Sequence, residues 1–204
     1  MKKVLLLIAS AFMFLNVNAS NVERIEYANA GDFSLGIMIG VPPYGGANMP
    51  TISVDGMWGL TDGFIHTKTF GDNGAIDLGG YIGYCHYGDG YDYGYHYDHY
   101  YWELPILVRC GFHFEFVKHL DVYAGFQGGI CLEHWRNEWE GDRYDVPGYE
   151  IEENGSHVDG VFGSYIGAKW HFNDNFGVKL EFSSDWIGDG NDLPGVAGGV
   201  TFNF

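Results

Sequence analysis

The chain has 204 residues, with 27 acidic side chains against 10 Lys and Arg, which gives a formal net charge of −17. Strong negative charge repels phosphate backbones and argues against nucleic acid as a partner. Glycine is abundant, at 32 residues, but only 6 prolines are present and glycine has no three-residue period, which excludes a collagen-like chain. The glycines are therefore expected in strands and turns.

The first residues have the pattern of a signal peptide. Lys2 and Lys3 precede an apolar run from Val4 to Leu15, and Val17 and Ala19 are the small residues expected before a cleavage site. About twelve apolar residues are too few to span a bilayer as a helix. We therefore predict that residues 1–19 are removed on export. Removal takes away two of the ten positive charges and no acid, so the net charge changes from −17 to −19.

The mature chain shows a persistent alternation of apolar and polar side chains. No run of eighteen apolar residues remains after residue 19, so any membrane span must consist of strands closed into a barrel. The two-residue period predicts eight strands. They cover residues 32–41, 51–60, 75–86, 103–114, 120–132, 161–172, 176–182 and 195–204. Asp55 and Gly56 interrupt the pattern of the second strand, and the stretch that follows it, 61–74, is long for a turn.

The connections between these strands alternate in length. Residues 115–119 and 173–175 are short turns on one side. The long connections on the other side cover residues 42–50, 87–102, 133–160 and 183–194. Short periplasmic turns and long external loops are typical of outer-membrane barrels, and an even number of strands returns the chain to the side where it began. We therefore predict an all-β fold: an eight-stranded antiparallel up-and-down transmembrane β-barrel over residues 32–204, preceded by a short N-terminal segment, residues 20–31.

Aromatic side chains gather where the predicted strands end, as expected for girdles at two lipid–water interfaces. The periplasmic group comprises Phe112, Phe114, Phe116, Trp170, Phe172, Phe176, Phe202 and Phe204, and the external group comprises Tyr84, Tyr101, Trp102 and Trp186. The barrel is thus expected to contact outer-membrane lipid through its apolar faces.

Three passages resemble a known family: residues 120–125, the hairpin 165–178 and the ending Gly-Val-Thr-Phe-Asn-Phe at 199–204. They are similar to the small bacterial outer-membrane β-barrels of the OmpX and OmpA-barrel type, especially those common in Bacteroidetes. The resemblance implies that Val200, Phe202 and Phe204 form the terminal signal read by the barrel-assembly machinery, and that the protein resides in the bacterial outer membrane. It implies little about activity.

Charged residues fall on the polar faces of the predicted strands, which point into the barrel. Charges away from water must be paired, so we predict a barrel-interior charge network. Its members are Arg109, Glu181, Lys169, Lys179, Asp77 and Asp121, with His113 and His171 on the same faces. The interior of eight strands is filled by side chains, which favours a structural role. A proton or ion path, or a small-ligand site, is the alternative.

Two long connections carry candidate recognition residues. In 87–102, Asp89, Asp92, His96, Asp98 and His99 stand amid Tyr and Gly, with spacing that fits neither a calcium loop nor a zinc site, so no metal is predicted. The alternation of Gly and Tyr also suits a hairpin beyond the membrane. Residues 133–160 carry nine acids against only Arg136 and Arg143, with several Trp and Tyr. A solvated external loop is the first interpretation, and this composition also suits a cationic or carbohydrate surface ligand.

No catalytic or redox motif is evident. There is no G-x-S-x-G or H-E-x-x-H. Ser183, Ser184 and Asp185 lie near a rim, with His99 or His134 as candidate partners whose proximity the sequence does not determine. The chain has three cysteines, Cys85, Cys110 and Cys131, and none of them is in a C-x-x-C spacing. We expect all three to be small side chains on strands, and the alternative is one disulfide bridge between two of them.

The predicted function is therefore non-enzymatic, without cofactor: envelope structure, or surface recognition and adhesion through acidic, aromatic external loops. Two alternatives stay open. One is a soluble lipocalin-like carrier of a small apolar ligand, whose apolar face would turn inward, and the other is a lipid-modifying outer-membrane enzyme.

Overall fold

The computed structural model describes residues 27–41, 49–68, 70–92, 96–143, 146–187 and 195–204. Eight strands form a closed barrel and two short ones form a separate hairpin. The barrel strands are β1 (Phe33–Val41), β2 (Thr51–Gly59), β5 (Ala75–Asp92), β6 (His96–Val117), β7 (Leu120–Arg143), β8 (Val146–Asn173), β9 (Phe176–Ile187) and β10 (Val196–Asn203). No described segment is a helix long and apolar enough to cross a bilayer. The predicted signal peptide, 1–19, lies outside the described residues and stays a prediction.

The barrel is antiparallel throughout and closes between its first and last strands. Successive barrel strands pair with one another, and β1 pairs with β10 from Ser34↔Asn203 to Val41↔Val196. Closure leaves every strand of the wall with two hydrogen-bonded neighbours, so the wall has no open edge. The predicted eight-stranded up-and-down barrel is confirmed.

The two faces of the wall differ in the way that the alternation predicts. Val108 is 62% exposed and Leu180 48% exposed on the outer face, whereas Arg109 and Glu181 are each 1% exposed on the inner face. Because side chains alternate across a strand, a shift of one residue would exchange these faces on that strand. The apolar positions named by the sequence pattern therefore point outward.

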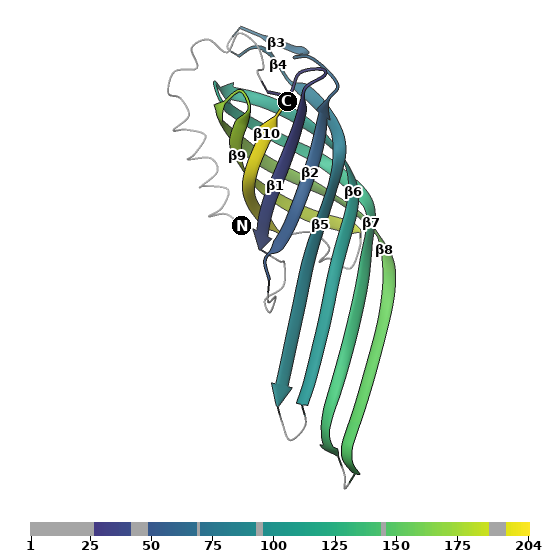
Figure 1. Ribbon diagram of the computed structural model, residues 1–204. Helices are drawn as coiled ribbons and strands as arrows, with labels where there is room; N and C mark the ends of the chain where they lie inside the picture. The colour runs from purple at the N-terminus through teal and green to yellow at the C-terminus, as the bar shows by residue number, and fades with distance from the viewer. Residues whose placement is uncertain (1–26, 42–48, 69, 93–95, 144–145, 188–194) are drawn as a thin grey trace, which may run out of the picture.

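Four strands continue far beyond the barrel wall. Figure 1 shows β5, β6, β7 and β8 running on as a sheet past the ends of β1, β2, β9 and β10. We call this sheet the extension: residues 87–92, 96–102, 133–143 and 146–160. The opposite end of the barrel, with the turns at Lys118–His119 and Asp174–Asn175, is called the turn end.

The prediction that 133–160 is a loop is wrong, and for 87–102 the structure has the alternative that was given, a hairpin beyond the membrane. Pairing continues to Asp92↔His96 between β5 and β6 and to Arg143↔Val146 between β7 and β8. The strand 176–182 was also predicted too short, since β9 reaches Ile187. An apolar–polar period marks a strand only where one face is shielded from water, and both faces of the extension are polar or aromatic.

A second hairpin, β3 (Ile65–Thr67) with β4 (Gly71–Asn73), occupies the long connection after β2, at the turn end (Figure 1). The Asn73 side chain fixes it to β6, because its Nδ2 donates to the Glu115 carbonyl (2.7 Å) and its Oδ1 accepts from the Glu115 N–H (2.9 Å). Phe64 and Phe70 pack edge-on against outward rings of β6, Phe112 and Phe114 respectively. The hairpin thus covers the outer wall at this rim.

Glycines on the inner wall make room for large side chains on the neighbouring strand. Tyr123 is paired with Gly167 across β7 and β8, and Gly125 is paired with Tyr165, so each ring lies over a glycine of the other strand. The two rings meet with their centroids 6.0 Å apart. The high glycine content is therefore partly a packing requirement of a narrow, filled barrel.

Replacing Gly167 with Ala is expected to destabilise the barrel by about 1–3 kcal/mol through overpacking. A β-carbon at this position would meet the Tyr123 ring and would lie 2.6 Å from the Leu180 carbonyl oxygen. The matched control is Gly198→Ala on the outer face, where the nearest atom is 3.8 Å away. Urea unfolding in detergent micelles, followed by tryptophan fluorescence, measures both. Equal stability of the two variants would contradict this packing.

Candidate functional site

The centre of the lumen holds an ion-paired layer built around Arg109. Its Nη1 lies 3.0 Å from Asp55 Oδ2, its Nη2 pairs with Glu181 Oε1, and its Nε donates to Gln127 Oε1 at 2.9 Å. Lys179 pairs with the same Asp55 and lies 3.7 Å from Glu181 Oε2. All four charged side chains are at most 5% exposed. Because the ions are shielded from bulk water, each depends on its partners here.

Aromatic rings enclose this layer. The Arg109 guanidinium lies 3.9 Å from the Tyr165 ring centroid and 4.9 Å from that of Tyr81. The Tyr123 hydroxyl donates to Glu181 Oε2 at 3.0 Å. Cation–π contacts and the phenolic hydrogen bond add to the ion pairs without introducing further charge.

A second charged layer lies nearer the turn end, centred on His113. Its Nε2 is 2.7 Å from Asp77 Oδ2 and its Nδ1 is 2.8 Å from Asp121 Oδ2. Ionised carboxylates only accept hydrogen bonds, and a neutral imidazole donates from one nitrogen alone, so both contacts require the imidazolium form. With His113 charged, the four carboxylates (Asp55, Asp77, Asp121, Glu181) balance four cations (Arg109, His113, Lys169, Lys179). The two layers are then neutral together, while the inner wall outside them also carries the buried acids Glu103, Glu115 and Glu133.

An apolar layer closes the lumen on the side of the extension. Met38, Tyr81, Leu107, Cys131, Val161 and Ala197 come from six different strands and form one buried cluster. Among the charged side chains themselves, the remaining space is about 10 Å³, enough for roughly one water molecule. The described lumen is therefore a packed interior and not an open channel.

The segment Tyr27–Asp32 covers the mouth of the barrel at the turn end. The Tyr27 ring stacks on His171 with centroids 3.7 Å apart and planes at 6°, and its hydroxyl is 2.7 Å from His119 Nδ1. The segment then joins β2, because the Gly31 N–H donates to the Gly59 carbonyl at 2.9 Å. Gly31 has φ 92°, a left-handed conformation that favours glycine.

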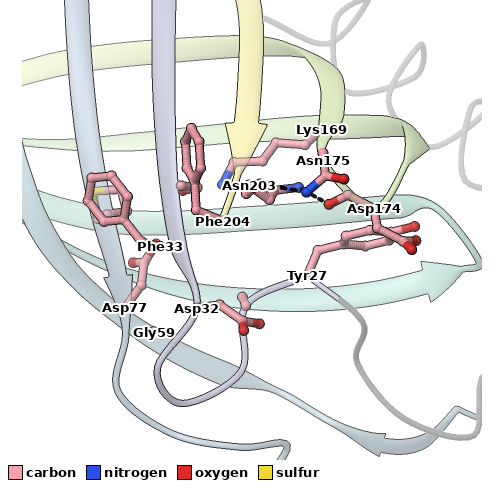
Figure 2. A pocket seen from close by; sticks show the side chains of 13 residues that line it. Tyr27, Asp32, Phe33, Gly59, Asp77, Lys169, Asp174, Asn175, Asn203 and Phe204 are labelled. Atoms are coloured by element: carbon pink, nitrogen blue, oxygen red, sulfur yellow. Dashed lines mark hydrogen bonds between the residues drawn. The ribbon is translucent and has the colours of Figure 1, made fainter.

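Between this segment and the barrel lies a cavity of about 250 Å³. Figure 2 shows Tyr27, Phe33, Lys169, Asn203 and Phe204 around it. The cavity borders the second charged layer through Asp77 and Lys169.

The extension has an aromatic inner face and a charged outer face. On β6, the rings of Tyr97, His99 and Tyr101 stack in succession, with centroids 6.5 and 6.4 Å apart. Burial, together with a hydrogen bond to Glu133, raises the pKa of the Tyr101 phenol. Tyr101 was predicted in the external girdle, but it lies on the inner face. On the outer face, Arg136 pairs with Glu138 and Glu152.

The structure brings the predicted interior residues into two separate groups. Arg109, Glu181 and Lys179 meet in the central layer, and Asp77, Asp121 and Lys169 meet in the second. The sequence interpretation missed Asp55, which bridges Arg109 and Lys179 and was taken as an interruption of a strand. Asp55 is an odd-numbered residue of a strand whose even-numbered residues, Ile52 and Val54, are apolar, and this alternation would have placed it on the inner face. Gln127, Tyr123 and Tyr165 were likewise not identified as partners.

The other predicted residues lie apart from this site. Val200 and Phe202 are on β10, and Phe204 follows this strand, with its N–H donating to the Phe33 carbonyl. The role of these three residues as an assembly signal stays a prediction.

The three cysteines, Cys85, Cys110 and Cys131, are free thiols. His134 contacts Ser156 and His99 contacts Asn137, not Ser183 or Ser184. Within the described ranges, no group of three or more His, Cys, Asp or Glu side chains could hold a metal ion.

A scan against protein-family models and a sequence search of curated proteins each gave no match. Among solved structures, the chain is similar to Ail, the attachment invasion locus protein of Yersinia pestis: 11% identity and TM-score 0.41, over 86% of this chain and 99% of that one. It is also similar to the N-terminal β-barrel domain of Pseudomonas aeruginosa OprF, with 14% identity and a TM-score of 0.38, over 86% of this chain and 98% of that one. Neisserial surface protein A is 14% identical with a TM-score of 0.33, over 84% of this chain and 92% of that one. All three are small outer-membrane β-barrels, and the likeness concerns the fold alone.

Proposed function

We propose that this chain is a non-enzymatic outer-membrane β-barrel protein whose extension stands on the cell surface and recognises a cation-rich partner. The observation that carries the proposal is the outward apolar band around the barrel. Large exposed apolar side chains occur on all eight barrel strands, including Ile37, Trp58, Ile82, Val108, Phe126, Ile166, Leu180 and Val196. In water such a continuous surface would be very unfavourable, whereas in acyl chains it is the expected surface.

The height of this band fits a bilayer. It covers nine residues on β1, from Phe33 to Val41, and eleven on β6, from Leu104 to Phe114. A transmembrane strand needs about 9–11 residues. Beyond the band, the outward positions of β7 become His134, Arg136 and Glu138, which belong in water.

The connections support one orientation. The short turns and both described ends of the chain, Tyr27 and Phe204, lie at the turn end, which faces the periplasm in outer-membrane barrels. The extension then projects outward from the cell. Under this orientation, the apolar lumen layer faces the exterior and the cavity faces the periplasm.

The lumen argues against the two alternatives. A carrier of an apolar ligand needs an apolar inner cavity, but the centre of this lumen is filled by ion pairs. For a lipid-modifying enzyme, Ser183 or Ser184 would need a free base. Ser183 contacts Glu181, but that carboxylate is already paired with Arg109, and Ser184 contacts the Asp185 carbonyl. A non-enzymatic role is therefore the better fit.

Charge and aromatic content favour a cationic partner for the extension. Residues 133–160 alone carry nine acids against two arginines. Aromatic faces such as those of Tyr97 and Tyr101 attract cations and add to the negative potential of the carboxylates. A rigid paired sheet also presents these groups with little loss of conformational entropy on binding.

Shortening the extension tests this role. We would join Tyr87 to Tyr101 and Trp135 to Gly155, which are cross-strand pairs, by Asn-Gly turns. The shortened barrel is expected to keep heat-modifiable gel mobility and to lose binding of poly-L-lysine by at least about tenfold, with full-length binding weakening as salt rises. Immobilised full-length and shortened proteins in detergent are compared by surface plasmon resonance.

Neutral dextran serves as the second probe. Binding of dextran but not poly-L-lysine by the full-length protein would reject the cationic partner and favour a carbohydrate. Equal binding of poly-L-lysine by both proteins would reject the extension as the binding surface.

A further inference from the structure

The cavity at the turn end contains a buried cation without a hydrogen-bond acceptor. Lys169 is 4% exposed, and its Nζ lies 4.0 Å from Asp121 Oδ2, beyond hydrogen-bond distance. That carboxylate oxygen is already within 2.8 Å of His113 Nδ1. Lys179, the other lysine of the lumen, contacts Asp55 directly. Lys169 is thus a buried ammonium that lines a cavity and has N–H donors without an acceptor.

Two residues that line the same cavity carry buried acceptors without donors. Asp77 Oδ1 and Asn203 Oδ1 have no hydrogen-bond partner among the described residues, and both residues line the cavity. Asp77 is 3% exposed. Buried polar atoms without partners are costly, so a donor group is expected to meet them.

Apolar surface completes the wall. Met57 and Ala28, each 6% exposed, line the cavity, and Tyr27 covers the mouth from the other side (Figure 2). The volume of about 250 Å³ equals that of roughly eight water molecules, at about 30 Å³ each. A molecule of about ten non-hydrogen atoms fits within it.

We propose that this cavity binds a small zwitterion of the amino-acid type. Its carboxylate accepts hydrogen bonds from Lys169, and its ammonium donates to Asp77 Oδ1 and Asn203 Oδ1. Its apolar side chain lies against Met57 and Ala28. Because the charged layers are already balanced, a zwitterion adds no net charge to the interior, whereas a simple anion or cation would.

This site is independent of the extension, since it lies at the opposite end of the barrel. In the proposed orientation, the ligand comes from the periplasm. Failure of poly-L-lysine binding therefore leaves this inference intact, and failure of zwitterion binding leaves the proposed surface role intact.

The experiment uses the folded full-length protein in detergent micelles and equilibrium dialysis with L-leucine as the probe. Two analogues test the charge requirement: 4-methylpentanoate lacks the ammonium, and 3-methylbutylamine lacks the carboxylate. Saturable binding of leucine is expected, with each analogue roughly 10- to 100-fold weaker through loss of charged hydrogen bonds. No saturable binding, or equal binding of an analogue, would overturn the proposal.

A matched pair of variants locates the binding. Ser34 lines the cavity, so Ser34→Leu fills part of it without removing a charge, whereas Ser164→Leu makes the same change on the outer face. Leucine affinity is expected to fall at least about tenfold in Ser34→Leu and to stay within about twofold in Ser164→Leu. Lys169→Met, checked for folding by gel mobility, should lose affinity as well. Undiminished binding by folded Ser34→Leu would place the leucine elsewhere and reject the site.

Discussion

Replacing Arg109 with Met is expected to lower the free energy of unfolding by about 3–5 kcal/mol, the cost typical of removing one partner from a buried ion pair. Arg109 is 1% exposed and contacts both Asp55 and Glu181. Without the guanidinium, Lys179 alone faces two buried carboxylates. The centre of the barrel would then carry an unbalanced negative charge that water cannot reach.

Urea titration of the protein folded in micelles or liposomes, followed by tryptophan fluorescence, measures this loss. The informative control is the double variant Arg109→Met/Glu181→Met, which removes one charge of each sign and leaves the Asp55–Lys179 pair. It is expected to be more stable than Arg109→Met alone, because balanced removal of buried charges is often neutral. A single variant that costs less than about 1 kcal/mol would show that water or rearrangement compensates for the missing charge.

Leu180→Arg is expected to cost about 2–4 kcal/mol, provided that the outer face lies in lipid. Leu180 is 48% exposed on the outer wall, and its partners across the sheet, Gly198 and Ala168, lie within the same apolar band. An arginine here would place a charge near the middle of the bilayer.

Asn154→Arg is the matched control, because Asn154 is an exposed residue of β8 in the extension. Its cost should be close to zero, since the side chain stays in water. Unfolding in liposomes distinguishes the two variants. If both leave stability unchanged, the outer wall is in water and the membrane assignment fails, because a solvent-exposed Leu-to-Arg change costs little.

Alternation along the strands predicts the fold. The period-2 pattern is local, so the faces of β1, β6 and β10 could be read from residues such as Ile37, Val108 and Val200. The same pattern identified most of the inward charges, Arg109 and Glu181 among them. A composition rich in glycine and aromatic residues fits the filled lumen, where Tyr165 lies over Gly125.

Tertiary structure decided which charges meet. Asp55 and Arg109 are 54 residues apart, and Lys179 is 124 residues from Asp55. Their pairing depends on barrel closure and on the shear between strands, which no local pattern contains. The split into an Arg109 layer and a His113 layer has the same origin.

The paired strands at 133–160 and the covered mouth also depend on the tertiary structure. An amphipathic period requires one dry face, and the strands of the extension have none. Residues 133–160 therefore carried no strand signal, and in 87–102 only the alternation of Gly and Tyr indicated a hairpin. Tyr27 covers the mouth through contacts with His119 and His171, which lie about 90 and 140 residues further along the chain. Sequence fixes which face of a strand is apolar because that depends on neighbours two residues away, whereas contacts across the lumen exist only once the eight strands have closed.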